Sequence, residues 1–324
     1  MNRIVVVGAG SFGTAIANSL AFNSRNKVLL LARDSFIVDS INSSGINPKY
    51  FPYFQLNKSL FASIDKGVMK KADIIFLAIP SSSVIRFISE NKIYINPAAI
   101  IVNLAKGFGE EGETLVESLE KLLTNRVVTM KGPTFADELI RGFPSAFTVG
   151  SRCEDEFNVI SNLVKHTNIR LDFSFDVFSV EILSILKNIY AIALGIVDAH
   201  FNSANTRNLV LTRAFREIRK ILRVLGGEEE ALYKYCGIGD FTLTGLNDLS
   251  RNRTLGLMIG KKFLSDTDSQ NSVVLEGVKA IRVVYNRILS QSLFFPIISL
   301  LYRLFEGAIS VRDFIDGVLS QEGW

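Results

Sequence analysis

Short apolar runs rich in β-branched residues recur through the first half of the chain, and polar or glycine-bearing segments separate them. Runs of this length and composition predict buried strands, and the segments after several of them carry apolar residues at helical spacing. Such alternation is typical of an α/β domain with a mainly parallel, doubly wound sheet. The predicted strands are residues 4–7, 27–32, 73–79, 99–104, 127–130, 146–149 and 169–173.

The pattern changes after about residue 175, where the strands stop and helical periodicity continues to the end of the chain. Residues 178–198 predict a long helix that is apolar almost all round and therefore largely buried. A second helix, over residues 205–225, ends at a pair of glycines. The chain has 324 residues, enough for two domains. We assign residues 1–177 to the α/β domain and residues 178–324 to an all-helical domain.

The long predicted helix has one unusual face. Lys187 is its only charge between Glu181 and Asp198. Because an unpaired ammonium is costly to bury, this position suits either a structural ion pair or a proton-transferring lysine beside a ligand. Helical spacing places Lys187 on a stripe of small and polar residues, namely Ser184, Lys187, Asn188, Ala191 and Gly195.

The first predicted strand runs into residues 8–13, GAGSFG, and a helix follows. In this arrangement Gly8 permits a tight turn, Gly10 lets the backbone approach a pyrophosphate, and Gly13 allows close packing of the helix. The N-terminus of the helix then favours the anion. The motif predicts dinucleotide binding in a Rossmann-type domain, and the alternative is a merely glycine-rich turn.

Arg33 stands at the end of the second predicted strand, where a domain that reads the ribose 2′-hydroxyl has an acidic residue. Asp34 follows it. An arginine there stacks on adenine or pairs with a 2′-phosphate, so that NADP(H) is tolerated beside NAD(H). The alternative is an ordinary surface arginine.

Three further segments are candidates for a ligand site. Lys106 follows one predicted strand, and residues 131–136, KGPTFA, follow the next, at the edge where parallel sheets bind ligands. Either segment is otherwise a loop with a helix cap. Residues 250–253, SRNR, combine a serine N-cap with two arginines and an asparagine, which suits a phosphate. A solvated basic helix start fits these residues equally well.

Composition narrows the class of protein. The chain is 48% hydrophobic with a net charge of +4 and no block of like charges, so we expect no nucleic-acid partner. Two distant cysteines and two histidines share no ligand spacing, which argues against a metal site and favours a reducing cytoplasm. Residues 4–24 are uncharged, but their glycines fit a strand and turn better than a signal peptide. We therefore expect no membrane insertion.

Several motifs together resemble one family, the bacterial-type NAD(P)-dependent sn-glycerol-3-phosphate dehydrogenases. They occur in order across nearly the whole chain, and LKN followed by GxGD and SRNR is far more specific than a glycine loop. The matches are GAGSFGTAIA at 8–17, NPKYFP at 47–52, AKGF at 105–108, GPTFADE at 132–138, LKNIYAIALGI at 186–196, LTR at 211–213, GIGDF at 237–241, SRNRTLG at 250–256 and VLEGV at 274–278.

The resemblance implies reduction of dihydroxyacetone phosphate to sn-glycerol 3-phosphate, the backbone precursor of phospholipids, with NAD or NADP as cofactor. It implies that Lys187 is the proton donor and acceptor, and that Lys106 and Asp240 take part in catalysis beside it. The substrate contacts that it implies are Lys106, Gly132, Thr134, Lys187, Asp240, Thr244, Ser250, Arg251 and Asn252. The cofactor contacts that it implies are Gly8, Gly10, Ser11, Phe12, Gly13, Arg33, Lys106, Ala136, Arg251, Val274 and Glu276.

The chain departs from the family pattern in two notable places. The family has a glycine-rich loop before LTR where this chain has residues 198–205, DAHFNSAN, and Lys131 before GPTF is atypical. A homodimer is a further expectation from the family.

Two other function classes compete with this assignment. One is a β-hydroxyacid-type dehydrogenase, but that class spaces its lysine and asparagine a helical turn apart, whereas Lys187 and Asn188 are adjacent. The other is a non-catalytic nucleotide-sensing protein. Such a protein is expected to lose the polar residues of its second domain, and Lys187, Asp240, Arg251 and Asn252 are all present.

Overall fold

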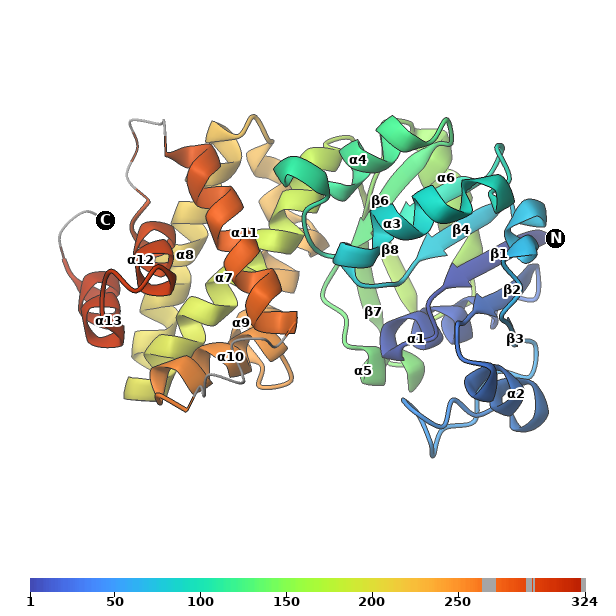
Figure 1. Ribbon diagram of the computed structural model, residues 1–324, viewed down its shortest axis with the longest axis horizontal. Coiled ribbons are helices and arrows are strands. Elements are labelled where there is room, and N and C mark those ends of the chain that lie inside the picture. Colours follow the sequence, from blue (N-terminus) through green and yellow to red (C-terminus); the bar gives the residue numbers. More distant parts are fainter. Residues whose placement is uncertain (264–271, 290–292, 294, 322–324) are drawn as a thin grey trace. The chain divides into compact units, whose positions relative to one another are not determined.

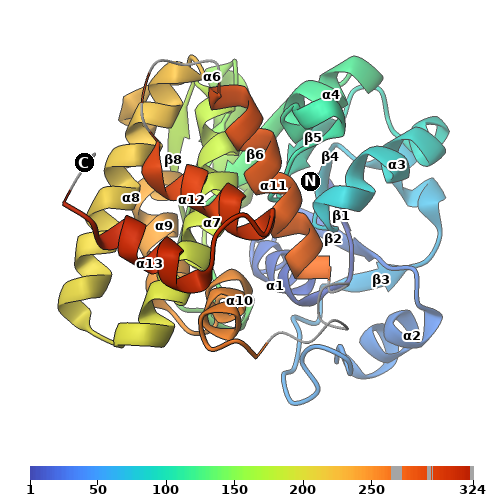
Figure 2. The same ribbon diagram turned by 60° about the vertical axis from the view of Figure 1, so that its left-hand side comes forward.

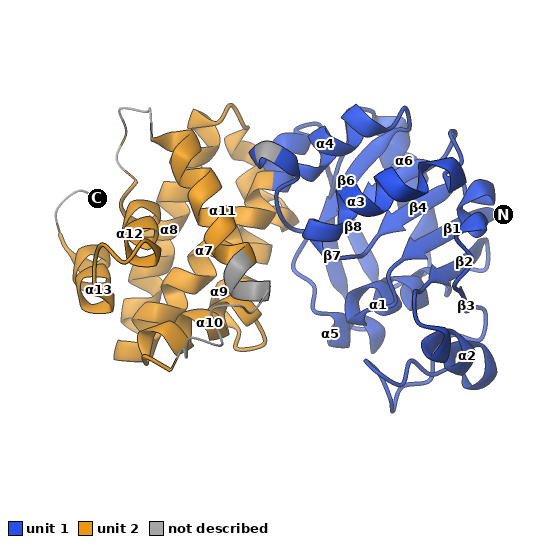
Figure 3. Ribbon diagram, in the orientation of Figure 1, with its two compact units in different colours: residues 1–181 blue, residues 182–324 orange. Residues whose placement is uncertain are grey.

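The computed structural model describes residues 1–263, 272–289, 293 and 295–321, without the side chains of residues 111 and 272–275. The chain forms two compact units, Met1–Glu181 and Ile182–Trp324 (Figure 3). Unit 1 is built of strands and helices, and unit 2 of helices (Figure 1). The division falls inside one long helix, slightly beyond residue 177.

Unit 1 is built on one sheet of eight strands, in the order β3-β2-β1-β4-β5-β6-β7-β8. Neighbouring strands are parallel except β6 and β7, which are antiparallel. The fold class is therefore the predicted one. The strands are β1 (Asn2–Val7), β2 (Asn26–Leu31), β3 (Phe61–Ser63), β4 (Ile74–Leu77), β5 (Ile100–Asn103), β6 (Val127–Lys131), β7 (Ser145–Gly150) and β8 (Ile169–Ser174).

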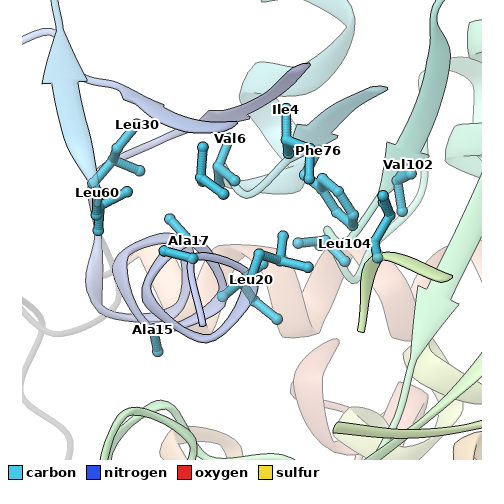
Figure 4. Packing of buried hydrophobic residues seen from close by; sticks show 14 of the residues in the cluster. Ile4, Val6, Ala15, Ala17, Leu20, Leu30, Leu60, Phe76, Val102 and Leu104 are labelled. Atoms are coloured by element: carbon cyan, nitrogen blue, oxygen red, sulfur yellow. The ribbon is translucent and has the colours of Figure 1, made fainter. Parts of the chain in front are cut away.

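The helices of unit 1 cover both faces of this sheet. They are α1 (Ser11–Leu20), α2 (Ser35–Ser44), α3 (Ser81–Asn91), α4 (Leu115–Leu122), α5 (Ala136–Ile140) and α6 (Glu154–Leu163), with short 3₁₀ turns at Lys66–Lys71, Lys92–Tyr94 and Glu110–Gly112. Along β1, Ile4 and Val6 join one apolar cluster with α1, and Val5 and Val7 join another with α3 and α4. Figure 4 shows side chains of the first cluster directed at α1. Burial on both faces explains why the central strands β4 and β5 consist almost entirely of apolar residues.

Helix α7 (Val177–Phe201) contains the predicted helix 178–198 and extends beyond it at both ends. From Ile182 onward it belongs to unit 2, where it contacts several other helices (Figure 2). The further helices described in unit 2 are α8 (Ala204–Val224), α9 (Asp240–Leu246), α10 (Arg251–Gly260), α11 (Ser272–Ile288), α12 (Pro296–Phe305) and α13 (Val311–Leu319). Short helical turns lie at Glu229–Tyr233 and Tyr235–Gly239.

By length and composition α7 would be able to cross a membrane. Of its most apolar 18-residue window, however, 94% is buried inside the protein. Such burial is typical of a core helix, and it accounts for the apolar character of α7 all round its circumference.

Helices α7 and α10 meet backbone to backbone. A Cβ on Gly256 of α10 would lie 2.1 Å from the carbonyl oxygen of Ile192, and a Cβ on Gly195 of α7 would lie 2.3 Å from the carbonyl oxygen of Arg253. Only glycine permits so close an approach. Gly195 belongs to the stripe of small residues identified in the sequence, so at this point the stripe faces α10.

Candidate active site

In unit 1 the predicted dinucleotide site begins at the turn between β1 and α1. Gly8 has a φ of +110°, and a Cβ there would lie 2.6 Å from the carbonyl oxygen of Ala78. A Cβ on Gly13 would lie 1.9 Å from the carbonyl oxygen of Gly8, so α1 packs directly onto the turn. At Gly10, in contrast, no described atom lies within 4 Å of a Cβ position, which leaves space in front of the backbone. The turn therefore has the three features that fit a pyrophosphate.

The N-terminus of α1 is suited to an anion. Its N-cap is Gly10, its first turn contains no acidic residue, and within the described part of the chain no side chain caps it. The first amides of a helix carry partial positive charge, so this end attracts a phosphate. Ser11 is exposed there, whereas Phe12 is half-buried and its ring centroid lies 6.2 Å from that of Phe147.

Asn47, a residue to which the sequence analysis assigned no role, holds this turn in place. It is fully buried, and its side-chain amide donates to the carbonyl oxygen of Ala9 at 3.1 Å and to the hydroxyl of Thr14 at 2.8 Å. Its Oδ1 atom has no hydrogen-bond partner among the described residues. The signal that pointed to Asn47 in the sequence was its place at the start of NPKYFP.

Arg33 lies just beyond the end of β2 and is exposed. The neighbouring carboxylate is already engaged, because Asp34 accepts the backbone N–H of Phe36 at 3.0 Å and caps α2. The guanidinium of Arg33 is therefore exposed at the end of β2, whereas the carboxylate of Asp34 caps α2.

The predicted substrate-side residues of unit 1 follow β5 and β6. Lys106 is half-buried, three residues after β5 ends, and Gly132 comes directly after β6. A Cβ on Gly132 would lie 2.2 Å from the carbonyl oxygen of Ala146, and the hydroxyl of Thr134 donates to that oxygen at 3.2 Å. Ala136 begins α5. The segment after β6 is thus tied to β7 rather than loose.

Unit 2 has its own group of predicted site residues, which centres on Lys187. Its side chain is buried, and its ammonium forms an ion pair with the buried carboxylate of Asp240. It also donates to the hydroxyl of Thr244 at 2.9 Å. The structure therefore contains the ion pair that was one of the two interpretations of Lys187. An ion pair of this kind does not exclude proton transfer by the same ammonium, so the second interpretation of Lys187 stays a prediction.

Asp240 and Thr244 come from one face of α9, since they are four residues apart. The turn that leads into α9 depends on Gly237, whose φ of −87° and ψ of −111° are not helical. A Cβ on Gly237 would lie 2.1 Å from the carbonyl oxygen of Leu232, so the chain needs a glycine there. The GIGD motif thus provides both the turn and the carboxylate.

Ser250 caps α10, as predicted, because its hydroxyl accepts the backbone N–H of Arg253 at 3.3 Å. The two arginines of the motif face different surroundings. Arg251 is exposed and Asn252 is half-buried, whereas Arg253 is buried and pairs with the carboxylate of Asp198 at 2.6 Å. Arg253 is therefore engaged within the protein, and of the two arginines only Arg251 is exposed, so Arg251 stays the predicted phosphate contact.

Residues 198–205, which depart from the family pattern, form a junction between two helices. Helix α7 continues to Phe201, Asn202 has a φ of +40°, and Ser203 caps α8 by accepting the backbone N–H of Thr206 at 3.4 Å. In place of the glycine-rich loop that the resemblance predicts, these residues form the end of α7 and the N-cap of α8.

Two predicted cofactor contacts lie on α11. Glu276 is exposed, and Val274 belongs to the same helix, with its side chain outside the described residues. Within unit 1 the structure brings together the glycine turn and Phe12 with its aromatic neighbour. Within unit 2 it brings Lys187, Asp240 and Thr244 into direct contact, and it packs α10, which carries Arg251 and Asn252, against α7.

A dinucleotide-binding sheet followed by a helical unit with a buried polar cluster defines a class of protein, the two-domain NAD(P)-dependent oxidoreductases. Residues 3–157 match the family model described as NAD-dependent glycerol-3-phosphate dehydrogenase N-terminus, and residues 176–316 match the corresponding C-terminus. The chain belongs to the NAD-dependent glycerol-3-phosphate dehydrogenase family.

Individual relatives support the same assignment. The glycerol-3-phosphate dehydrogenase [NAD(P)+] of Methanothermobacter thermautotrophicus is 37% identical over 315 residues, which are 96% of each chain. That of Halothermothrix orenii is 35% identical over 310 residues, 94% of this chain and 90% of its own. The crystal structure of glycerol-3-phosphate dehydrogenase from Coxiella burnetii is similar with a TM-score of 0.88 at 26% identity, and 99% of each chain is covered.

A weaker likeness extends to another group of reductases. A ketopantoate reductase of the PanE/ApbA family from Ralstonia eutropha has a TM-score of 0.59 at 14% identity, covering 98% of this chain and all of that chain. This likeness shows a shared fold alone. The family match therefore decides against the two competing classes considered from the sequence.

Proposed function

We propose that this protein catalyses the reversible NAD(P)H-dependent reduction of dihydroxyacetone phosphate to sn-glycerol 3-phosphate, with Lys187 as proton donor and acceptor. The observation that carries the proposal is the buried cluster of Lys187, Asp240 and Thr244 in a chain of this family. The product would supply the backbone of glycerophospholipids.

The reduction adds a hydride to the carbonyl carbon and a proton to the carbonyl oxygen. When bound, the reduced nicotinamide supplies the hydride. Negative charge then develops on the oxygen, and we assign to the Lys187 ammonium the tasks of stabilising that charge and delivering the proton. In the reverse direction the neutral amine of Lys187 takes the proton back from the hydroxyl of the product.

Asp240 and Thr244 hold this lysine for its task. The carboxylate of Asp240 favours the charged form of the ammonium in a site where burial alone would disfavour it. The hydroxyl of Thr244 accepts a second hydrogen bond and so limits the directions in which the amine points. We therefore count Asp240 as part of the proton-transfer machinery.

The substrate phosphate is assigned to the start of α10. Arg251 supplies a guanidinium, Asn252 an amide, and the capped helix end a favourable dipole. Ser250 keeps the helix start in shape through its cap. Lys106, Gly132 and Thr134 remain proposed substrate contacts in unit 1.

The residues of unit 1 fit a dinucleotide. The space at Gly10 and the N-terminus of α1 would receive the pyrophosphate, and Ser11 and Phe12 border that space. We propose that Arg33 receives the 2′-phosphate of NADP, so that both NADPH and NADH are used. Lys106, Ala136, Arg251, Val274 and Glu276 remain proposed cofactor contacts.

We further propose that the protein is a cytoplasmic homodimer. Free cysteines support a reducing compartment, since Cys153 and Cys236 are both unbridged. The dimer is a family-based expectation, and sedimentation velocity of the purified protein tests it against a monomer.

The test of the proposed reaction is the loss of reduced-nicotinamide absorbance with purified protein and dihydroxyacetone phosphate, with NADH and NADPH run in parallel. Dihydroxyacetone without phosphate and a 2-keto acid serve as controls. Oxidation that needs the phosphate supports the proposal. Turnover of the 2-keto acid instead, or cofactor binding with no turnover of any of them, would overturn it.

A further inference from the structure

A buried ion pair that the proposed reaction does not use lies next to Lys106. Lys131 is the last residue of β6, and Glu181 lies in the second turn of α7. The Nζ atom of Lys131 is 2.9 Å from Oε1 of Glu181, and the two side chains are 0% and 1% exposed. All the residues of this network belong to unit 1.

The ammonium of Lys131 has two further acceptors, and both are backbone carbonyls just before Lys106. Its Nζ donates to the carbonyl oxygen of Asn103 at 3.2 Å and to that of Ala105 at 2.5 Å. Together with Glu181, these carbonyls give the ammonium three acceptors, and an ammonium has three N–H donors. The lysine thus joins β6 to the turn that follows β5.

The carboxylate of Glu181 also accepts hydrogen bonds from side chains of β5 and β6. It accepts from the side-chain amide of Asn103 at 3.0 Å and from the hydroxyl of Thr129. The Oδ1 atom of Asn103 in turn accepts the backbone N–H of Ala105 at 3.0 Å. Both backbone groups of Ala105 are therefore bonded within the network, the N–H by Asn103 and the carbonyl by Lys131.

A buried ion pair is a poor device for stability alone. Replacement of such a pair by apolar side chains of similar volume is often neutral or stabilising, because two charges must leave water to form it. Apolar contacts, however, do not fix the orientation of a backbone group, whereas hydrogen bonds do. Here the directed bonds converge on Ala105, one peptide unit before Lys106.

We propose that Lys131 and Glu181 are positioning residues that fix the Ala105 turn and thereby hold Lys106 in the geometry that turnover requires. The inference rests on the proposed function, in which Lys106 contacts the substrate. Lys131 itself touches the backbone of the turn and acts through Lys106.

The test uses a variant that removes both charges without leaving one of them unpaired. Lys131→Met alone strands the Glu181 carboxylate and is expected to lower the melting temperature. Lys131→Met combined with Glu181→Gln keeps the volume and an acceptor for the hydroxyl of Thr129, and is expected to recover most of that loss. Lys27→Met makes the same lysine replacement at an exposed position of β2 and serves as the matched control.

The decisive readout is a double-mutant cycle with Lys106→Met. In the native background the double charge removal is expected to lower kcat/KM for dihydroxyacetone phosphate at least tenfold. In the Lys106→Met background it is expected to change kcat/KM less than twofold, because its effect passes through Lys106. An equal loss in both backgrounds, or no loss in the native one, overturns the inference.

A second readout does not depend on turnover. Hydrogen exchange of the backbone amides of residues 105–107 is expected to speed up at least tenfold in the double variant, while amides of β1 and β4 keep their protection. Unchanged exchange at 105–107 overturns the inference. Absence of turnover in the native protein would instead refute the proposed function, and the exchange result would still stand.

Discussion

The guanidinium of Arg253 lies 2.6 Å from the carboxylate of Asp198, and this ion pair binds the first turn of α10 to the last turns of α7. The two side chains are 5% and 3% exposed. The same guanidinium donates to the carbonyl oxygen of Gly245 at 3.2 Å, just before the end of α9. One buried cation thus joins three helices immediately beside Arg251 and Asn252.

We expect Arg253→Met to lower the free energy of unfolding and to raise KM for dihydroxyacetone phosphate. Loss of one partner from a buried pair costs about 3–5 kcal/mol, and the lower end applies because Asp198 keeps its pair with Arg207 at 2.6 Å. Urea denaturation and steady-state kinetics measure the two effects. Arg216→Met, at an exposed position of α8, is the matched control. If the variant is destabilised but its KM is normal, Arg253 does not influence the proposed phosphate site.

Gly256→Ala is expected to destabilise the protein by about 3 kcal/mol, since its Cβ would lie 2.1 Å from a backbone oxygen that cannot move aside alone. Gly317→Ala provides the contrast. Its Cβ would lie 2.9 Å from the flexible Leu300 side chain, and alanine favours helix, so stability should stay within about 1 kcal/mol of the native value. Chemical denaturation compares them, and equal stability of both variants would contradict the close α7–α10 contact.

Lys187→Met should lower kcat by at least about 10²-fold, the lower bound for loss of a positioned proton donor. Binding of NADPH, followed by fluorescence titration, should remain close to native because the glycine turn is untouched. Asp240→Asn keeps a hydrogen-bond acceptor but removes the charge that favours the ammonium, so its activity should fall and its pH profile should shift. Near-native turnover of Lys187→Met would refute the proton-transfer role.

Arg33→Gln should reduce kcat/KM for NADPH about tenfold and leave kcat/KM for NADH nearly unchanged, because a 2′-phosphate is present only in the first cofactor. Steady-state kinetics with each cofactor give the ratio. Arg25→Gln removes another exposed arginine of unit 1 and should not alter this ratio. An equal loss with both cofactors would indicate adenine stacking instead.

Glu217 makes stability depend on pH. Burial raises the pKa of its carboxyl from 4.5 to about 7, against the opposing hydrogen bonds from the backbone of Ile298 and Ile297 and from Tyr190. Because the folded state holds this proton more tightly, the stabilisation is complete below pH 4.5 and is lost as the pH rises to about 7. The loss is on the order of 3 kcal/mol.

Denaturation of the native protein and of Glu217→Gln at several pH values between 4.5 and 8 measures this contribution. The amide does not titrate, so the variant should show a smaller fall in the free energy of unfolding across that range. The same slope in both proteins would mean that other groups carry the pH dependence.

Much of unit 1 was predictable because its central strands are buried on both faces and therefore appear as apolar runs, as in β1, β4 and β5. Strand β3 was not predicted, because it has only three residues and Phe61 is exposed, so that the sequence shows no buried apolar run there. The antiparallel pairing of β6 with β7 was not predicted either. Strand direction depends on how the connection returns to the sheet, which the composition of the strands does not record.

The candidate site was predictable in its residue types and less so in its contacts. Helical spacing placed Lys187 and Gly195 on one stripe, but the stripe's neighbours come from α9 and α10, more than 50 residues further on. The two arginines of SRNR look alike in sequence, yet Arg253 is buried and Arg251 is exposed. Residues two positions apart point to nearly opposite sides of a helix, and of these two it is Arg253 that points toward Asp198 of α7.

The sequence by itself determined most of the strands, the long helix, the glycine turn and the lysine that needs a partner, because periodicity, backbone freedom and the cost of burying a charge act locally. Only the tertiary structure decided the partners of the buried charges. Lys187 meets Asp240, Arg253 meets Asp198, and Lys131 meets Glu181, each across 50 or more residues of chain. Such pairs are chosen by packing, since a charge is paired with whichever opposite charge the fold encloses beside it.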